Sequence, residues 1–113
     1  MFKSIDLFEA RKDGYHVYRI PGIIVTKRNV VVVTTEARTK GGGDWDPNDV
    51  LMRRSFDEGN TFQERQLIVD HKDYGEGPIS NFVLISDRTS GRVIALYCYK
   101  YSRVFTMFSD DDC

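Results

Sequence analysis

The stretch Ser55-Phe56-Asp57-Glu58-Gly59-Asn60-Thr61-Phe62 decides the fold of this chain. It has the form S-x-D-x-G-x-T-F, in which short polar side chains can hydrogen-bond the backbone of a turn. The glycine can adopt a left-handed conformation at no steric cost. Because β-rich runs flank it on both sides, the stretch predicts a tight turn that joins two antiparallel strands.

The rest of the chain has an all-β pattern. Short runs rich in β-branched and aromatic residues alternate with clusters of glycine, asparagine, aspartate or lysine. The predicted strands are Val17–Thr26, Val30–Glu36, Asp49–Ser55, Arg65–Asp70, Ser80–Ser86, Arg92–Tyr99 and Arg103–Ser109. The first four form one antiparallel unit with the shape of a propeller blade. Blade lengths of roughly 40 to 50 residues give the chain about two blades.

The second blade is expected to be incomplete. Ser109-Asp110-Asp111-Asp112 begins the S-x-D-x pattern again, and Cys113 stands where the pattern has glycine. Before the first blade, residues 3–10 read as a further strand. We therefore expect a single partial propeller unit over residues 1–113, with an N-terminal strand at 3–10, blade one at 17–70 and blade two at 78–113.

Three motifs, taken in order, resemble the N-terminal part of a sialidase (neuraminidase) β-propeller. Tyr18-Arg19-Ile20-Pro21 matches the arginine-bearing motif near the start of sialidase catalytic domains. Glu36-Ala37-Arg38 and then Asp44 follow it, and residues 55–62 match an Asp-box, or BNR repeat. The resemblance covers nearly the whole chain and implies a propeller fold.

The resemblance also implies that the Asp-box is structural and lies at the outer edge of the blade, away from any site. Its side chains would bind the turn backbone, and its aromatic residue would tuck into the blade. The residues concerned are Ser55, Asp57, Gly59, Thr61 and Phe62.

Two arginines are candidates for substrate binding. Sialic acid carries a carboxylate, which guanidinium groups bind as bidentate forks. Arg19 matches the first arginine of the sialidase triad, and its alternative is an ion pair with a nearby acid on the surface. Arg38 would contact the sugar ring, and its alternative is a solvated charge at a strand end.

The loop over residues 39–48 carries the candidate general acid. Asp44 aligns with the mobile-loop aspartate that protonates the leaving glycosidic oxygen in sialidases. Asp46 lies close to the same alignment, so the choice between the two acids stays open. Trp45 would line the pocket or cover the base of the loop.

The remaining parts of a sialidase site have no match in this chain. The resemblance places the nucleophilic tyrosine, its glutamate partner and two further arginines in later blades. We therefore expect a sialidase-like glycoside hydrolase fragment, or a subunit that forms a site by assembly, with weak or absent hydrolysis in a monomer. The alternative is a non-catalytic carbohydrate-binding or structural propeller module.

The composition reduces the range of partners and cofactors to be expected. The net charge is −1, with 16 basic and 17 acidic residues and no basic cluster, so no nucleic acid is expected. No run approaches the roughly 20 apolar residues of a membrane span, and no signal peptide is visible, so the location stays open. Cys98 and Cys113 do not suggest a disulfide framework. His16 and His71 lack ligand-spaced companions, so no metal or other cofactor is expected.

The expected partners are a sialylated glycan or another carboxylated sugar, and further copies of the chain. Unpaired strand edges attract other chains, and the extra strand at 3–10 would fill the place missing from blade two of a neighbouring copy. Such a head-to-tail contact is heterologous and can close a ring. The resemblance to six-bladed sialidases favours a trimer among the propellers of about 4 to 8 blades.

Overall fold

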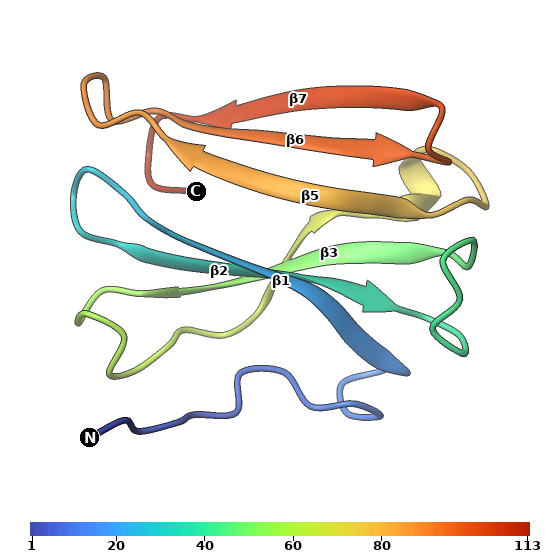
Figure 1. Cartoon of the computed structure of the whole chain (residues 1–113), viewed down its shortest axis with the longest axis horizontal. Helices are drawn as coiled ribbons and strands as arrows, with labels where there is room; N and C mark the ends of the chain where they lie inside the picture. The colour runs from blue at the N-terminus through green and yellow to red at the C-terminus, as the bar shows by residue number, and fades with distance from the viewer.

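The computed structural model describes residues 1–113 and consists mainly of two antiparallel sheets, which lie one above the other in Figure 1. The first sheet, here called blade one, has the order β1-β2-β3-β4, and the second, blade two, has the order β5-β6-β7. The elements are β1 (Val17–Val25), β2 (Val31–Arg38), β3 (Asn48–Ser55), β4 (Gln66–Val69), the 3-10 turn η1 (His71–Asp73), β5 (Ile79–Ser86), β6 (Val93–Tyr99) and β7 (Arg103–Ser109). In both sheets neighbours in sequence pair, as in a propeller blade. The predicted all-β fold, with blade two incomplete, is confirmed.

The strand bounds agree closely with those predicted from the sequence. The clearest difference is that β2 continues past Glu36 to Arg38. It does so because Arg38 pairs with Val17 on one side and with Asn48 on the other. No helix in the structure is long and apolar enough to cross a bilayer.

The N-terminal segment differs from the prediction, since residues 1–16 contain no strand and the strand expected over 3–10 is absent. An extended segment forms a strand only where a neighbouring backbone supplies hydrogen-bond partners along its length. Instead the segment bends beneath blade one, on the side away from blade two (Figure 1), and the Leu7 carbonyl accepts from Arg53 Nη1 at 2.9 Å.

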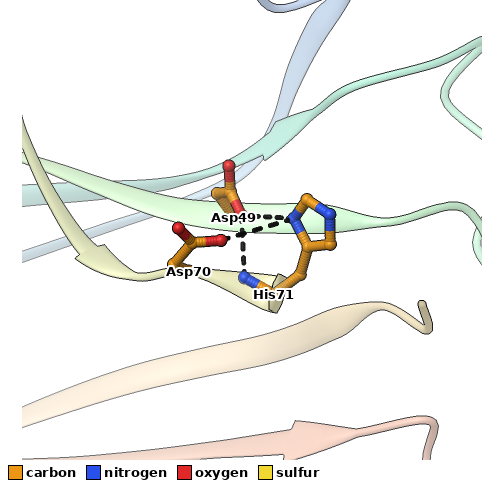
Figure 2. A group of neighbouring side chains, drawn as sticks. All are labelled: Asp49, Asp70 and His71. Atoms are coloured by element: carbon orange, nitrogen blue, oxygen red, sulfur yellow. Dashed lines mark hydrogen bonds and ion pairs between the residues drawn. The ribbon is translucent and has the colours of Figure 1, made fainter. Parts of the chain in front are cut away.

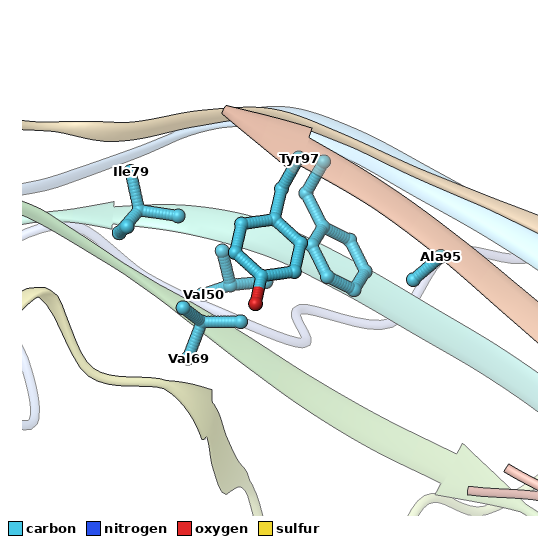
Figure 3. Packing of buried hydrophobic residues seen from close by; sticks show 6 residues of the cluster. Val50, Val69, Ile79, Ala95 and Tyr97 are labelled. Atoms are coloured by element: carbon cyan, nitrogen blue, oxygen red, sulfur yellow. The ribbon is translucent and has the colours of Figure 1, made fainter. Parts of the chain in front are cut away.

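The main core lies between the two blades, where their facing side chains meet (Figure 3). The six buried residues of this cluster are Val50, Val69, Ile79, Phe82, Ala95 and Tyr97. The first two come from blade one and the other four from blade two. Full burial of a large apolar side chain stabilises a fold by about 1.5–3 kcal/mol. Each blade therefore stabilises the other.

The inner strands β1 and β5 lie side by side and carry a β-bulge at matching positions. The register shifts after Arg19 in β1 and after Ser80 in β5. The next residues, Ile20 and Asn81, have φ angles of 54° and 56°. This region is unfavourable for a β-branched residue such as Ile20, and such strain concentrates at functional sites. The end of β2, which lies beside these bulges, is therefore a candidate location for a functional site.

The Asp-box stretch forms a turn that its own side chains hold closed. Ser55 Oγ donates to Asp57 Oδ1 at 2.7 Å and accepts from Gly59 N at 2.9 Å. Asp57 also accepts from Thr61, from the backbone N at 2.8 Å and from Oγ1 at 2.6 Å. Gly59 has a φ of 87°, which explains glycine at this position. Phe62, the last residue of the stretch, is half-buried.

The end of blade two repeats the same turn. Ser109 Oγ donates to Asp111 Oδ1 and accepts from Cys113 N at 2.9 Å. Cys113 has a φ of 65° at the place where the first turn has glycine. The neighbouring Asp112 is buried and pairs with Arg28 of blade one at 2.6 Å. The turn therefore also contributes to the contact between the blades.

The bonds to Asp57 predict that its variants lose stability in a pH-dependent way. Hydrogen bonds from Thr61, and then from Ser55, lower the pKa of Asp57 to about 2. Because this folded-state pKa lies below the ordinary value of about 3.9, the stabilisation is full above that value and is lost as the pH falls through the folded-state pKa. We expect Asp57→Asn to be less stable than the wild type at neutral pH, and the difference to shrink between about pH 4 and pH 2. Urea unfolding across this range measures it, and a constant difference would contradict the assignment.

Candidate anion-binding site

Arg19 lies at the bulge of β1 and extends toward the loop between β2 and β3. Its side chain is 47% exposed. Its Nη1 atom donates to the Gly42 carbonyl and to Asp44 Oδ1, both at 3.3 Å. Arg19 is therefore a partly solvated cation whose present partner is a loop carboxylate.

Arg38, the last residue of β2, lies beneath the same loop and is only 2% exposed. Its Nη1 atom donates to the carbonyls of Gly42 and Gly43 at 3.1 and 3.0 Å, and to Asp44 Oδ1 at 3.1 Å. Its Nη2 atom donates to Glu36 Oε2 at 2.6 Å. Arg38 is thus not a solvated strand-end charge, and a sugar would reach it only after the loop moved.

The two arginines converge on a single oxygen of Asp44. Guanidinium groups only donate hydrogen bonds, so this oxygen acts as an acceptor. The Asp44 side chain is 65% exposed and faces the two cations from the solvent side. To deliver a proton to a leaving group, Asp44 would first have to leave both guanidinium groups. In this conformation the arrangement holds an anionic oxygen.

The loop owes its shape to short-range bonds around its glycines. Thr39 Oγ1 donates to the Pro47 carbonyl at 2.8 Å and closes the base of the loop. Gly42 has a φ of 85°, and a Cβ there would lie 3.1 Å from Val17. Asp46 Oδ2 accepts from Gly43 N at 3.2 Å, so this carboxylate is occupied with the turn. Of the two candidate acids, only Asp44 faces the arginines.

Trp45 follows Asp44 and is 68% exposed. Its ring meets the ring of Tyr101 edge to face, with centroids 4.9 Å apart. Tyr101 also donates its hydroxyl to the Asp44 carbonyl at 2.7 Å. A residue of blade two therefore holds the loop of blade one at the position of the candidate acid.

No sequence motif gave Tyr101 a role. It lies in the three-residue turn between β6 and β7, where Lys100 and Tyr101 have φ angles of 52° and 55°. Positive φ angles are uncommon for residues other than glycine, asparagine and aspartate. The short spacing between the predicted strands was the available signal, since it places Tyr101 at the hairpin tip.

Glu36 is a second residue that belongs to one of the motifs but had no predicted role. It is buried, with 1% of its side chain exposed. One carboxylate oxygen binds Arg38, and the other accepts from the backbone N of Asn81 at 2.8 Å. Its importance could have been inferred from the sequence, because Glu36 is a charged residue within a run that is otherwise apolar and rich in threonine.

Trp45 also lines a groove of about 600 Å³. Its lining residues are Lys40, Trp45, Asp46, Pro47, His71, Lys72, Gly75 and Glu76. Cations and carboxylates occur together in this lining. Unlike the site of Arg19 and Arg38, the groove has no arginine in its lining.

Asp49, Asp70 and His71 form a separate cluster near the start of η1 (Figure 2). Asp49 Oδ1 lies 2.6 Å from His71 Nδ1 and accepts from His71 N at 2.9 Å. Its other oxygen accepts from the Tyr15 hydroxyl at 2.7 Å, and burial together with this bond raises the pKa of Tyr15. Two ligands of one tetrahedral metal ion would lie about 3.3 Å apart. The cluster is therefore arranged as a hydrogen-bond hub and does not fit a metal centre.

The comparison with known sequences points to sialidases. No protein-family model matches the chain. Over 108 residues the chain is 28% identical to a sialidase from Micromonospora viridifaciens, a match that covers 93% of this chain and 16% of that protein. The resemblance to sialidases stated from the motifs is supported, and the chain spans less than a fifth of that relative.

The solved structures show the same fold. The intramolecular trans-sialidase from Ruminococcus gnavus superposes with a TM-score of 0.68 and 19% identity, covering 76% of this chain and 22% of that one. The K499G mutant of NanB sialidase from Streptococcus pneumoniae gives a TM-score of 0.70 and 19% identity, covering 82% and 17%. The fold is therefore that of part of a sialidase-like β-propeller.

Proposed function

We propose that this chain supplies the carboxylate-binding part of a sialidase-like glycoside hydrolase site, which recognises sialic acid or another carboxylated sugar. The observation that carries the proposal is the convergence of Arg19 Nη1 and Arg38 Nη1 on one carboxylate oxygen, at 3.3 and 3.1 Å. A ligand carboxylate would make the same charge-assisted bonds, which are about twice as strong as neutral ones.

Asp44 occupies this position from within the chain. When a ligand carboxylate replaces it, the Asp44 side chain moves off the arginines and becomes free to approach the glycosidic oxygen. General acid catalysis requires that approach to within hydrogen-bond distance. The same displacement thus couples binding of the carboxylate to release of the candidate acid.

The proposal assigns neither the nucleophile nor the further arginines of a complete site to residues of this chain. A non-catalytic carbohydrate-binding module remains the second candidate, because binding through Arg19 and Arg38 does not require turnover. The two candidates differ in one measurement, which is release of a fluorogenic aryl group from an α-linked sialoside. Turnover that Asp44→Ala abolishes favours the hydrolase, and binding without turnover favours the module.

Binding is tested by titrating the ¹⁵N-labelled chain with N-acetylneuraminic acid and, separately, with its neutral methyl ester. We expect the acid to shift the amide signals of residues 38–46 and the ester to bind at least about tenfold more weakly, because it lacks the anionic group. Arg19→Ala should weaken binding of the acid by a similar factor. Arg88→Ala is the matched control, since Arg88 is exposed in the turn between β5 and β6. Equal binding of acid and ester would contradict the proposal.

A further inference from the structure

Glu36 joins the anion-binding site to blade two. Its side chain is 1% exposed and lies between a guanidinium of blade one and a backbone N–H of blade two. Arg38 Nη2 donates to one oxygen at 2.6 Å, and Asn81 N donates to the other at 2.8 Å. The Glu36 carboxylate therefore connects the two blades directly at this point.

The geometry at Asn81 is unusual and serves this contact. Asn81 is the bulge residue of β5, with a φ of 56°. A bulge leaves a residue out of the regular ladder, and here the N–H of Asn81 is directed to Glu36. The bulge therefore provides a backbone donor at the inner edge of blade two.

A carboxylate is required in this position because both neighbours donate hydrogen bonds. Ionised Glu36 accepts on both oxygens, whereas a glutamine has one accepting oxygen and one donating amide group. A buried charge without its partner is strongly unfavourable. These requirements fix Glu36 in one orientation and, through it, Arg38.

We propose that Glu36 is a positioning residue that sets Arg38 relative to the bulge of blade two, so that the two arginines converge only when blade two is in place. The inference rests on the proposed function, because it concerns the same anion-binding site. It adds that recognition of a carboxylate by blade one depends on the backbone of blade two. Glu36 itself does not touch the ligand.

The primary test is Glu36→Gln, read by the ¹⁵N–¹H side-chain signal of Arg38 in the full chain. In the wild type we expect a sharp signal, because Arg38 is buried and held through both Nη atoms. In Glu36→Gln we expect this signal to broaden, while most backbone amide signals keep their positions. A sharp and unshifted Arg38 signal in the variant would overturn the proposal.

Ligand affinity gives the second measurement. Glu36→Gln should bind N-acetylneuraminic acid about tenfold more weakly than the wild type, as expected for loss of one charge-assisted hydrogen bond. Arg88→Ala is the matched control, since Arg88 is exposed in the turn between β5 and β6. It should retain both the Arg38 signal and the affinity, and a tenfold loss in this control would also overturn the proposal.

Two outcomes separate the inference from the proposed function. If the wild type does not bind the sugar, the proposed function fails, but the Arg38 signal still decides the role of Glu36. If Glu36→Gln does not fold, Glu36→Asp replaces it, because it keeps the charge but is one methylene too short to contact both donors. An Arg38 signal unchanged in Glu36→Asp contradicts the proposal, and a broadened one supports it.

Discussion

Replacing Arg38 by methionine is expected to lower the free energy of unfolding by about 3–5 kcal/mol, the usual effect of removing one partner from a buried ion pair. Arg38 is 2% exposed, and Glu36, its partner at 2.6 Å, is 1% exposed. Methionine fills a similar volume but leaves the Glu36 carboxylate without its cation. It also removes the donor to the carbonyls of Gly42 and Gly43. Urea unfolding followed by circular dichroism at pH 7 measures the loss.

The double variant Glu36→Leu/Arg38→Met provides the control, because it leaves no unpaired charge. Replacing both members of a buried pair by apolar residues is often close to neutral. We therefore expect the double variant to be more stable than Arg38→Met alone. Arg88→Met, at an exposed position, should change stability by less than about 0.5 kcal/mol. A double variant less stable than Arg38→Met would show that the pair itself does not explain the loss.

The strands could be predicted from the sequence because their signals are local. Alternating apolar positions and polar turn clusters are contained within each strand and its two ends. The Asp-box turn is equally local, since Ser55, Asp57 and Thr61 bond within one stretch of chain. Segments of this kind need no knowledge of what lies across the fold.

The N-terminal segment shows where the same reasoning was wrong. Residues 3–10 have the composition of a strand, but a strand depends on a partner backbone that the pattern cannot supply. In this structure the segment instead contacts blade one through the Leu7 carbonyl and Arg53.

The site was predictable only in part, for a related reason. Arg19, Arg38 and Asp44 could be selected because their motifs are contiguous, and all three lie together in the structure. The contacts that fix them come from blade two, through Asn81 and Tyr101, which are far away in sequence. Both residues have positive φ angles, which the residue types Asn and Tyr in strand-like surroundings do not reveal. Contacts between blades therefore require the structure.

The dependence of each blade on the other leads to the second large expected effect. Ile79→Ala should lower the free energy of unfolding by about 3 kcal/mol, within the range of about 2–5 kcal/mol for such truncations. Ile79 is fully buried between the blades. Ile85→Ala is a matched control, because Ile85 lies in the same strand but is 64% exposed on the opposite face. It should change stability by no more than about 0.5 kcal/mol in a monomer.

The control also tests assembly, because Ile85 belongs to an apolar face on blade two. The exposed residues of this face are Val83, Ile85, Leu96, Val104 and Phe108. Register places Ile85, Ile94 and Phe108 in one row across the sheet. Exposed apolar faces of this kind commonly mark contact surfaces, and we propose that another copy of the chain covers this face. The strand exchange expected from residues 3–10 does not support this contact, because those residues form no strand. If a second copy covers the face, Ile85→Ala should destabilise the protein by an amount that grows with protein concentration. Light scattering coupled to size exclusion should then show a smaller mass for Ile85→Ala than for the wild type, whereas a wild-type monomer at micromolar concentration would rule out a second copy on this face.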